Sequence, residues 1–195
     1  MSDSRTFAIV GAGVAGAKAA EALRTEGFDG RIVLLGAEPH RPYERPPLSK
    51  AYLQGSASRD TVFVHLPEWY TEHHVDLRVD TTVTAIDRRA HELVTVDGDR
   101  LRYDKLLLAT GATPRRLRVP GGVHSLRSLD DSEHLKAALQ PGTRVVIIGA
   151  GWIGLETAAA ARTAGAEVTV LEHAELPLLR VLGPQLAKVF ADLHT

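Results

Sequence analysis

Residues 7–16 read FAIVGAGVAG, an apolar run that leads directly into a Gly-x-Gly-x-x-Gly spacing. An Ala-rich stretch continues to Arg24, and a second apolar run occupies residues 31–35. The order strand, glycine turn, helix, strand is typical of a βαβ unit that binds a dinucleotide. We therefore predict such a unit at the start of the chain.

The same pattern returns later in the chain. Residues 145–154 read VVIIGAGWIG, an Ala-rich stretch runs to Thr163, and Glu167 is followed by residues 168–171, which are apolar or β-branched. Strands that are apolar throughout are expected to be buried on both faces, as in a parallel sheet. Two βαβ units this far apart predict two nucleotide sites rather than a short solenoid repeat.

The glycines of the two turns have separate physical tasks. The first permits the tight turn, the second removes a side chain from the path of the pyrophosphate, and the third lets helix and strand pack closely. The helix that follows offers free N–H groups and the positive end of its dipole to the phosphates. The predicted phosphate-binding glycines are Gly11, Gly13, Gly16, Gly149, Gly151 and Gly154.

An acidic residue is expected about 20 positions after the last glycine, where it holds the ribose hydroxyls. Glu172 meets this rule in the second unit, at the end of its second strand. A carboxylate there accepts hydrogen bonds from a 2′-hydroxyl and repels a 2′-phosphate, which favours NADH over NADPH. Glu38 is the candidate in the first unit, slightly later than the rule requires.

The segment between the two units reads as β-rich. Residues 83–86, 92–96 and 101–103 have strand character, Asp97-Gly98 predicts a hairpin turn, and residues 105–110 read as a buried strand. A helix is expected at 130–139, with Asp130 and Glu133 as its capping box. A last helix is expected from Gly183-Pro184 to His194.

Composition excludes several classes of function. The 195 residues carry a net charge of −1, which gives no reason to expect nucleic acid or an anionic membrane as partner. The lack of cysteine excludes a disulfide framework, a cysteine-ligated metal and a catalytic thiol, and it fits a cytoplasmic protein. We see no signal peptide, no apolar run long enough to cross a bilayer, no metal motif and no Gly-x-Ser-x-Gly.

Residues 39–50, PHRPYERPPLSK, follow the first βαβ unit directly. Together with residues 109–111 and 149–156, this segment closely resembles the ferredoxin-reductase class of FAD/NAD-linked reductases, which is putidaredoxin- and rubredoxin-reductase-like and belongs to the pyridine nucleotide-disulfide oxidoreductase superfamily. The resemblance implies that Lys50 lies beside the flavin ring and pairs with Glu156. A cation at that place favours the anionic reduced flavin, and a buried lysine needs a partner.

The resemblance also implies further contacts with FAD or NADH. Arg45 is suited to them by its fork of donors. The remaining positions are Ala15, Val83, Ala109, Thr110, Gly111, Arg127 and Ile153.

The fold implied is α/β, with a doubly wound, Rossmann-like FAD domain at residues 1–112, a three-stranded β excursion, and a nested NAD-binding βαβ domain at 113–195. Family members are roughly twice as long, so we expect the NAD domain to be incomplete and apolar surface to be exposed.

The implied reaction passes electrons from NADH through FAD to a small iron–sulfur protein of the ferredoxin or rubredoxin type. Without a cysteine, electrons cannot pass from flavin to a protein thiol. Two alternatives stay open: an NADH oxidoreductase with another acceptor, and a redox-sensing module that binds nucleotides without turnover.

Overall fold

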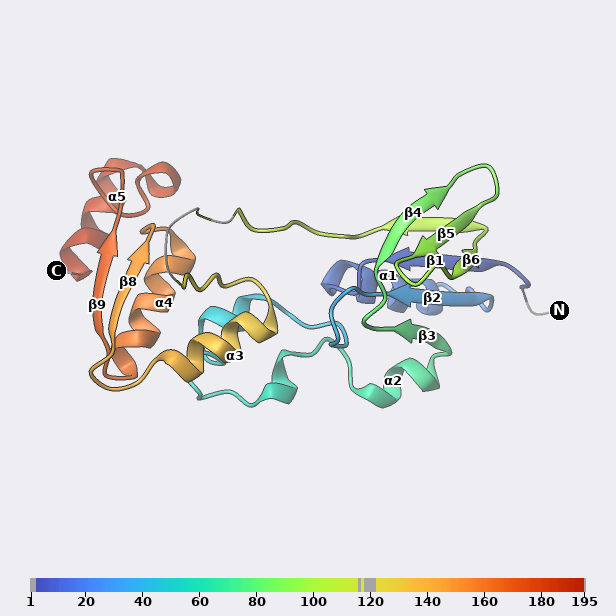
Figure 1. Ribbon diagram of the computed structural model, residues 1–195, viewed down its shortest axis with the longest axis horizontal. Helices are drawn as coiled ribbons and strands as arrows, with labels where there is room; N and C mark the ends of the chain where they lie inside the picture. The colour runs from blue at the N-terminus through green and yellow to red at the C-terminus, as the bar shows by residue number, and fades with distance from the viewer. Residues whose placement is uncertain (1–2, 116, 118–121, 195) are drawn as a thin grey trace. The chain divides into compact units, whose positions relative to one another are not determined.

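The computed structural model describes residues 3–115, 117 and 122–194. It consists of two compact units (Figure 1). The first comprises Met1–Glu44 and Phe63–Thr113, and the second comprises Arg45–Val62 and Pro114–Thr195. Contacts therefore group residues 45–62 with the second unit, although they precede most of the first unit's β-rich segment in the chain. The division at residues 112 and 113 stays a prediction.

A four-stranded parallel sheet forms the centre of the first unit. Its strand order is β3 (Val75–Arg78), β2 (Arg31–Leu35), β1 (Thr6–Val10) and β7 (Lys105–Leu108). Helices α1 (Val14–Thr25) and α2 (Pro67–Glu72) pack on one face, where Ile9, Ile32 and Leu34 meet Ala20 and Tyr70.

The other face of this sheet meets the β excursion. Ala8, Val10, Val33 and Leu35 form a second core with residues of the three-stranded antiparallel sheet. That sheet comprises β4 (Val83–Asp87), β5 (Glu92–Thr95) and β6 (Arg100–Arg102). Because alternate side chains of β1 and β2 enter two different cores, both faces are buried. The prediction of a parallel sheet with a three-stranded excursion is confirmed.

The second unit is built on two parallel strands, β8 (Arg144–Ile148) and β9 (Glu167–Leu171). The helices are α3 (Leu129–Ala138), α4 (Trp152–Thr163) and α5 (Leu179–His194), and residues 45–62 add the 3₁₀ turns η1 (Pro46–Ser49) and η2 (Arg59–Val62). Leu53 packs with Leu135 and Ala161 in one core, so residues 45–62 contribute to the interior of this unit.

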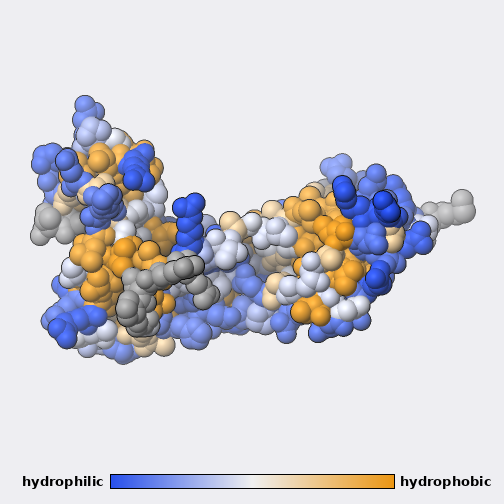
Figure 2. All heavy atoms as spheres, turned by 45° about the horizontal axis from the view of Figure 1, so that its top comes forward, coloured by the Kyte–Doolittle hydropathy of each residue, from blue (hydrophilic) through white to orange (hydrophobic). Residues whose placement is uncertain are grey.

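One face of the β8–β9 sheet is exposed. Val146 is 62% exposed and Ile148 57%, whereas their neighbours in sequence are half-buried. Figure 2 shows hydrophobic surface on the part of the molecule at its left, which contains this unit. Burial on both faces was the wrong expectation for these strands, because only one face is covered by the described residues of the unit. Exposed apolar surface was expected and is present.

Three local predictions need correction. Helix α3 begins one residue early, with Ser128 as its N-cap and Asp131, not Glu133, completing the capping box. Strand β7 ends at Leu108, although the Ala109 N–H still donates to Val10 O at 2.7 Å. Helix α5 begins at Leu179 and kinks at Gly183, whose φ of +74° is non-helical, so Pro184 follows a kink rather than opening the helix.

Candidate functional site: two glycine turns

The first glycine turn joins β1 to α1. Gly11 has a φ of +114°, in the region that favours glycine, and a Cβ there would lie 2.1 Å from Ala109 O. A Cβ on Gly16 would lie 2.0 Å from Gly11 O. These two glycines are therefore required by the chain itself, the first by its backbone conformation and the second by the closeness of helix and turn. The turn also lies against the end of β7, near Thr110.

The second turn, between β8 and α4, has nearly the same construction. Gly149 has a φ of +105°, and its N–H donates to Leu171 O at 2.7 Å. A Cβ on Gly154 would lie 2.0 Å from Gly149 O. The difference is that a Cβ on Gly149 would meet nothing within 4 Å, because no described strand lies where β7 lies in the first unit.

The middle glycines behave differently from their neighbours. Gly13 (φ −93°) and Gly151 (φ −82°) are N-caps in extended conformation, which any residue adopts. A Cβ on either would meet no atom within 4 Å. Neither backbone strain nor packing of the described chain therefore requires glycine at these two positions, and each leaves an open space at a helix N-terminus.

The helices at both turns lack a capping side chain at their N-termini. Neither α1 nor α4 has a side-chain cap or an acidic residue in its first turn. The first-turn N–H groups, those of Ala15 and Ile153 among them, have no intrahelical acceptor. Such an end attracts anions through its N–H groups and its dipole.

Each unit also carries the acidic residue predicted for it. Glu38 follows β2 and accepts a hydrogen bond from the buried Tyr43 hydroxyl. Glu172 follows β9, and its carboxylate accepts from the N–H groups of Ala150 at 2.7 Å, His173 at 2.8 Å and Ala174 at 3.0 Å. These hydrogen bonds, first those of Ala174 and Ala150, lower the pKa of Glu172. Glu172 thus stays ionised and is tied to the glycine turn.

The remaining first-unit candidates lie around the turn or on the excursion. Ala109 and Thr110 lie beside Gly11, and Gly111 follows with a φ of +71°. Val83 begins β4 and packs against the core shared with β1 and β2. Their geometry brings residues 109–110 together with the glycine turn, and it gives Val83 a packing role.

Lys50 and Glu156 meet within the second unit. The Lys50 ammonium lies 2.9 Å from Glu156 Oε2, and the two side chains are 52% and 27% exposed. Lys50 follows η1 and Glu156 lies on α4, so 106 positions of sequence separate two groups in direct contact. The Ser49 hydroxyl donates to the same Glu156 oxygen at 2.5 Å. Sequence reasoning missed Ser49, because a serine beside a motif lysine carries no signal of its own.

Arg45 and Arg127 also lie together. A guanidinium N–H of Arg45 donates to the Arg127 carbonyl, and the Arg127 N–H donates to Asp131 Oδ2 at 2.9 Å. Arg45 therefore fixes the chain just before α3. The predicted pair of Lys50 with Glu156 is thus formed, and residues 45–62 make both contacts, one to α4 and one to the segment before α3.

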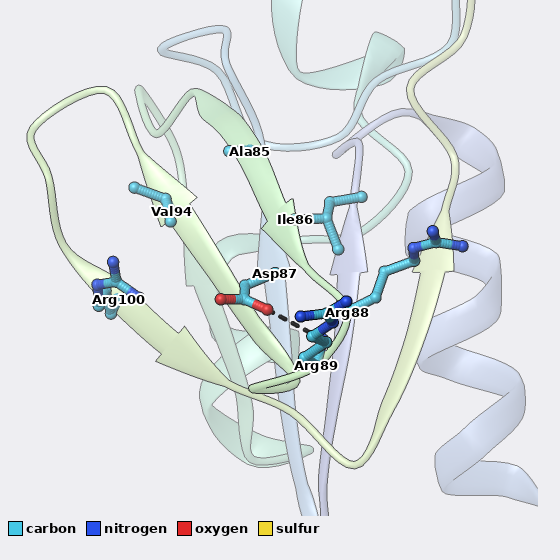
Figure 3. A pocket seen from close by; sticks show the side chains of 7 residues that line it. All are labelled: Ala85, Ile86, Asp87, Arg88, Arg89, Val94 and Arg100. Atoms are coloured by element: carbon cyan, nitrogen blue, oxygen red, sulfur yellow. Dashed lines mark hydrogen bonds between the residues drawn. The ribbon is translucent and has the colours of Figure 1, made fainter.

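Two hollows lie away from these residues. One of about 590 Å³ lies on the excursion and is lined by Ile86, Arg88, Arg89 and Arg100, among others (Figure 3). Figure 3 shows Asp87 turned toward the backbone of Arg89, and its carboxylate accepts a hydrogen bond of 2.9 Å from the Arg89 N–H. A second of about 350 Å³ is mostly apolar and lies between α1, β1 and β7. Neither contains a predicted site residue.

The part of the chain that the structure describes contains no helix with the length and apolar character that a membrane span requires. Within the same residues, no group of three or more His, Cys, Asp or Glu side chains is arranged to hold a metal ion.

Known proteins resemble nearly the whole chain. It is 42% identical over 97% of its length to "Rhodocoxin reductase" of Rhodococcus erythropolis, of which it covers 45%. It is 45% identical over 91% of its length to "Biphenyl dioxygenase system ferredoxin--NAD(+) reductase component" of Paraburkholderia xenovorans, covering 44% of it. The chain thus spans about half the length of the curated relatives it matches.

Solved structures agree with the relatives. The structure titled "Crystal structure of the covalent putidaredoxin reductase-putidaredoxin complex" matches with a TM-score of 0.93 and 40% identity, over 97% of this chain and 47% of that one. The sequence profile of the family described as "Pyridine nucleotide-disulphide oxidoreductase" matches residues 5–195. The chain belongs to the pyridine nucleotide-disulphide oxidoreductase family.

Proposed function

We propose that this chain is part of an NADH-dependent flavoprotein reductase that passes electrons through FAD to a small iron–sulfur carrier of the ferredoxin or rubredoxin type. In this proposal the first glycine turn, at residues 11–16, binds FAD and the second, at residues 149–154, binds NADH. The domains run from 1 to 112 and from 113 to 195, and the protein acts in the cytoplasm. The relatives' names, which include ferredoxin–NAD(+) and rhodocoxin reductases, support the choice of acceptor.

The open middle glycines carry the proposal. Gly13 and Gly151 are glycines that nothing in the described chain requires, each at a helix N-terminus without a side-chain cap. A dinucleotide pyrophosphate needs both features, because its oxygens must approach the backbone closely and accept its N–H groups. The residues present therefore fit a dinucleotide at both turns.

The chain's own residues bind and orient in this proposal. FAD, when bound, supplies a centre that accepts two electrons as a hydride and releases them singly. We assign Glu38 and Glu172 to the ribose hydroxyls of FAD and NADH, and Arg45 and Arg127 to FAD contacts. Glu172 is ionised, which favours the 2′-hydroxyl of NADH and disfavours the 2′-phosphate of NADPH.

Lys50 and Glu156 are assigned to the flavin because residues 39–50 resemble the family's segment. Lys50 would favour negative charge on the reduced ring, and Glu156 would hold the ammonium in place. Val83, Ala109, Thr110 and Gly111 are assigned to contacts with FAD on the same basis. No proton needs to be transferred by a side chain for the hydride step in this scheme.

A spectroscopic titration tests the proposal. The chain would be mixed with FAD, and its visible absorption recorded before and after anaerobic NADH, with NADPH as the matched comparison. We expect a flavin spectrum perturbed by the protein, bleaching by NADH, and slower bleaching by NADPH. An unperturbed spectrum would count against FAD binding. Binding without bleaching would favour a nucleotide-binding module without turnover, and reduction of a ferredoxin by the bleached protein would support the acceptor.

A further inference from the structure

Ser49 closes the η1 turn and is 6% exposed. Its hydroxyl lies 2.5 Å from Glu156 Oε2 and 3.5 Å from Pro46 O. A serine hydroxyl has one proton to donate, and 3.5 Å is at the outer limit of a hydrogen bond. The Ser49 hydroxyl therefore donates its hydrogen bond to the carboxylate. Glu156 Oε2 accepts hydrogen bonds from both Ser49 and Lys50.

The backbone that carries Ser49 is itself held in place. Leu48, its neighbour in η1, is buried, and its carbonyl accepts a hydrogen bond of 2.8 Å from the fully buried Ser132 of α3. Leu53, just beyond, enters the core with Leu135. Because η1 is anchored on α3, the Ser49 hydroxyl offers Glu156 a donor at a fixed place.

The Lys50 side chain is anchored less firmly, since its ammonium also contacts Pro46 O at 3.3 Å but is not buried. The side chain is 52% exposed, and an exposed Lys–Glu pair changes an unfolding equilibrium only about one- to fivefold, since two long side chains must be ordered against water. A carboxylate already oriented by a buried donor loses less freedom when it binds the ammonium. The geometry therefore makes Ser49 the stronger determinant of where Glu156 Oε2 lies.

We propose that Ser49 is a positioning residue that orients the Glu156 carboxylate to receive Lys50. The proposal concerns contacts within the second unit. Only its consequence for flavin reduction rests on the function proposed above.

Mutant cycles on the 195-residue chain test this. In a Trp69→Phe background Trp152 of α4 is the one tryptophan left, so its fluorescence in urea reports the second unit. We expect Ser49→Ala to raise the unfolding constant about tenfold, as for a hydrogen bond to a charged group. The factor by which Lys50→Met raises the unfolding constant should be about fivefold smaller in the Ser49→Ala variant than in the wild type. This coupling between the two substitutions should vanish in a Glu156→Gln background.

Thr163→Val is the control, since it removes a hydroxyl of this unit that donates to a backbone carbonyl, Ala159 O at 2.9 Å, and that belongs to neither η1 nor α3. Its coupling to Lys50→Met should stay below about twofold. If Ser49→Ala fails to fold, Ser49→Cys keeps the size and supplies only a weak donor, so the same loss of coupling is expected. Additive effects of Ser49 and Lys50, or a coupling that survives Glu156→Gln, would overturn the proposal.

Flavin reduction provides a second readout. With FAD bound, Ser49→Ala should slow anaerobic reduction by saturating NADH severalfold, and Ser49→Thr, which keeps the hydroxyl, should restore most of the rate. If the wild-type chain is not reduced by NADH, the proposed function fails, whereas the coupling in urea still decides the role of Ser49. Coupling without flavin reduction would support the role of Ser49 but not the proposed function. Flavin reduction without coupling would overturn the role of Ser49 and leave the proposed function standing.

Discussion

Alanine at Gly13 or at Gly16 should separate the need for a ligand from the need for packing. At Gly13 the added methyl meets no atom of the chain within 4 Å, and the backbone is already in extended conformation. The cost to folding is that of a poorer N-cap, about 1 kcal/mol or less. At Gly16 the methyl would lie 2.0 Å from Gly11 O and 3.1 Å from Leu34 Cδ1.

The two variants therefore differ in which property they lose, FAD affinity at Gly13 and stability at Gly16. Alanine inside a helix gains about 1 kcal/mol over glycine, but backbone cannot yield at 2.0 Å, and overpacking costs about 1–3 kcal/mol or more. We expect Gly16→Ala to be destabilised by at least 1–2 kcal/mol on this scale. Gly13→Ala should fold almost normally and lose FAD affinity about 10- to 100-fold, because its methyl occupies the path of the pyrophosphate.

The assay needs both quantities for each variant. Urea unfolding would be followed by Trp69 fluorescence in a Trp152→Phe background, and FAD affinity by quenching of flavin fluorescence. Wild-type FAD affinity in Gly13→Ala would refute the argument that this glycine serves a ligand. Wild-type stability in Gly16→Ala would refute the close approach of α1 to the turn.

Three further outcomes are expected. The lowered pKa of Glu172 means that its contribution to stability is present above the ordinary value of 4.5 and is lost as pH falls through the lower folded value, so Glu172→Gln should flatten the acid branch of a stability–pH curve. Burial, then the hydrogen bond to Glu133, raises the pKa of Tyr52 to about 12, so Tyr52→Phe should remove one late-ionising phenol from an absorbance titration at high pH. Ser128→Ala should cost about 1 kcal/mol in urea unfolding, whereas Ser128→Asp should retain the cap of α3.

The parts of the fold that follow from local pattern were predictable. An apolar run, a glycine turn and an Ala-rich stretch fix strand, turn and helix within about 25 residues, and both copies form as expected. The positive φ at Gly11 and Gly149 follows from the same rule. The open space beside Gly13 and Gly151 could not be derived from the sequence pattern, because it depends on where the rest of the folded chain lies.

The misplaced capping box shows why local patterns fail at boundaries. Both Ser128 with Asp131 and Asp130 with Glu133 have the required spacing, and sequence alone does not separate them. The structure engages Glu133 elsewhere, since its carboxylate accepts from Tyr52 at 2.8 Å and Arg59 at 2.9 Å. Those donors are 81 and 74 positions away, so tertiary contacts decided which acid became the cap.

The same contacts explain how a pair distant in sequence is assembled. Residues 45–62 bind α3 through Leu48 to Ser132 and through Tyr52 to Glu133, and in this arrangement Lys50, which follows η1, reaches Glu156 of α4. Resemblance could match Lys50 with Glu156, but it could not indicate that α3 sets their geometry. The ion pair therefore depends on α3 as well as on α4, whereas the glycine turn is formed by β8 and α4. A change that loosens α3 should weaken the pair while leaving the turn intact, whereas a change at the turn should disturb both, because the turn opens the helix that carries Glu156.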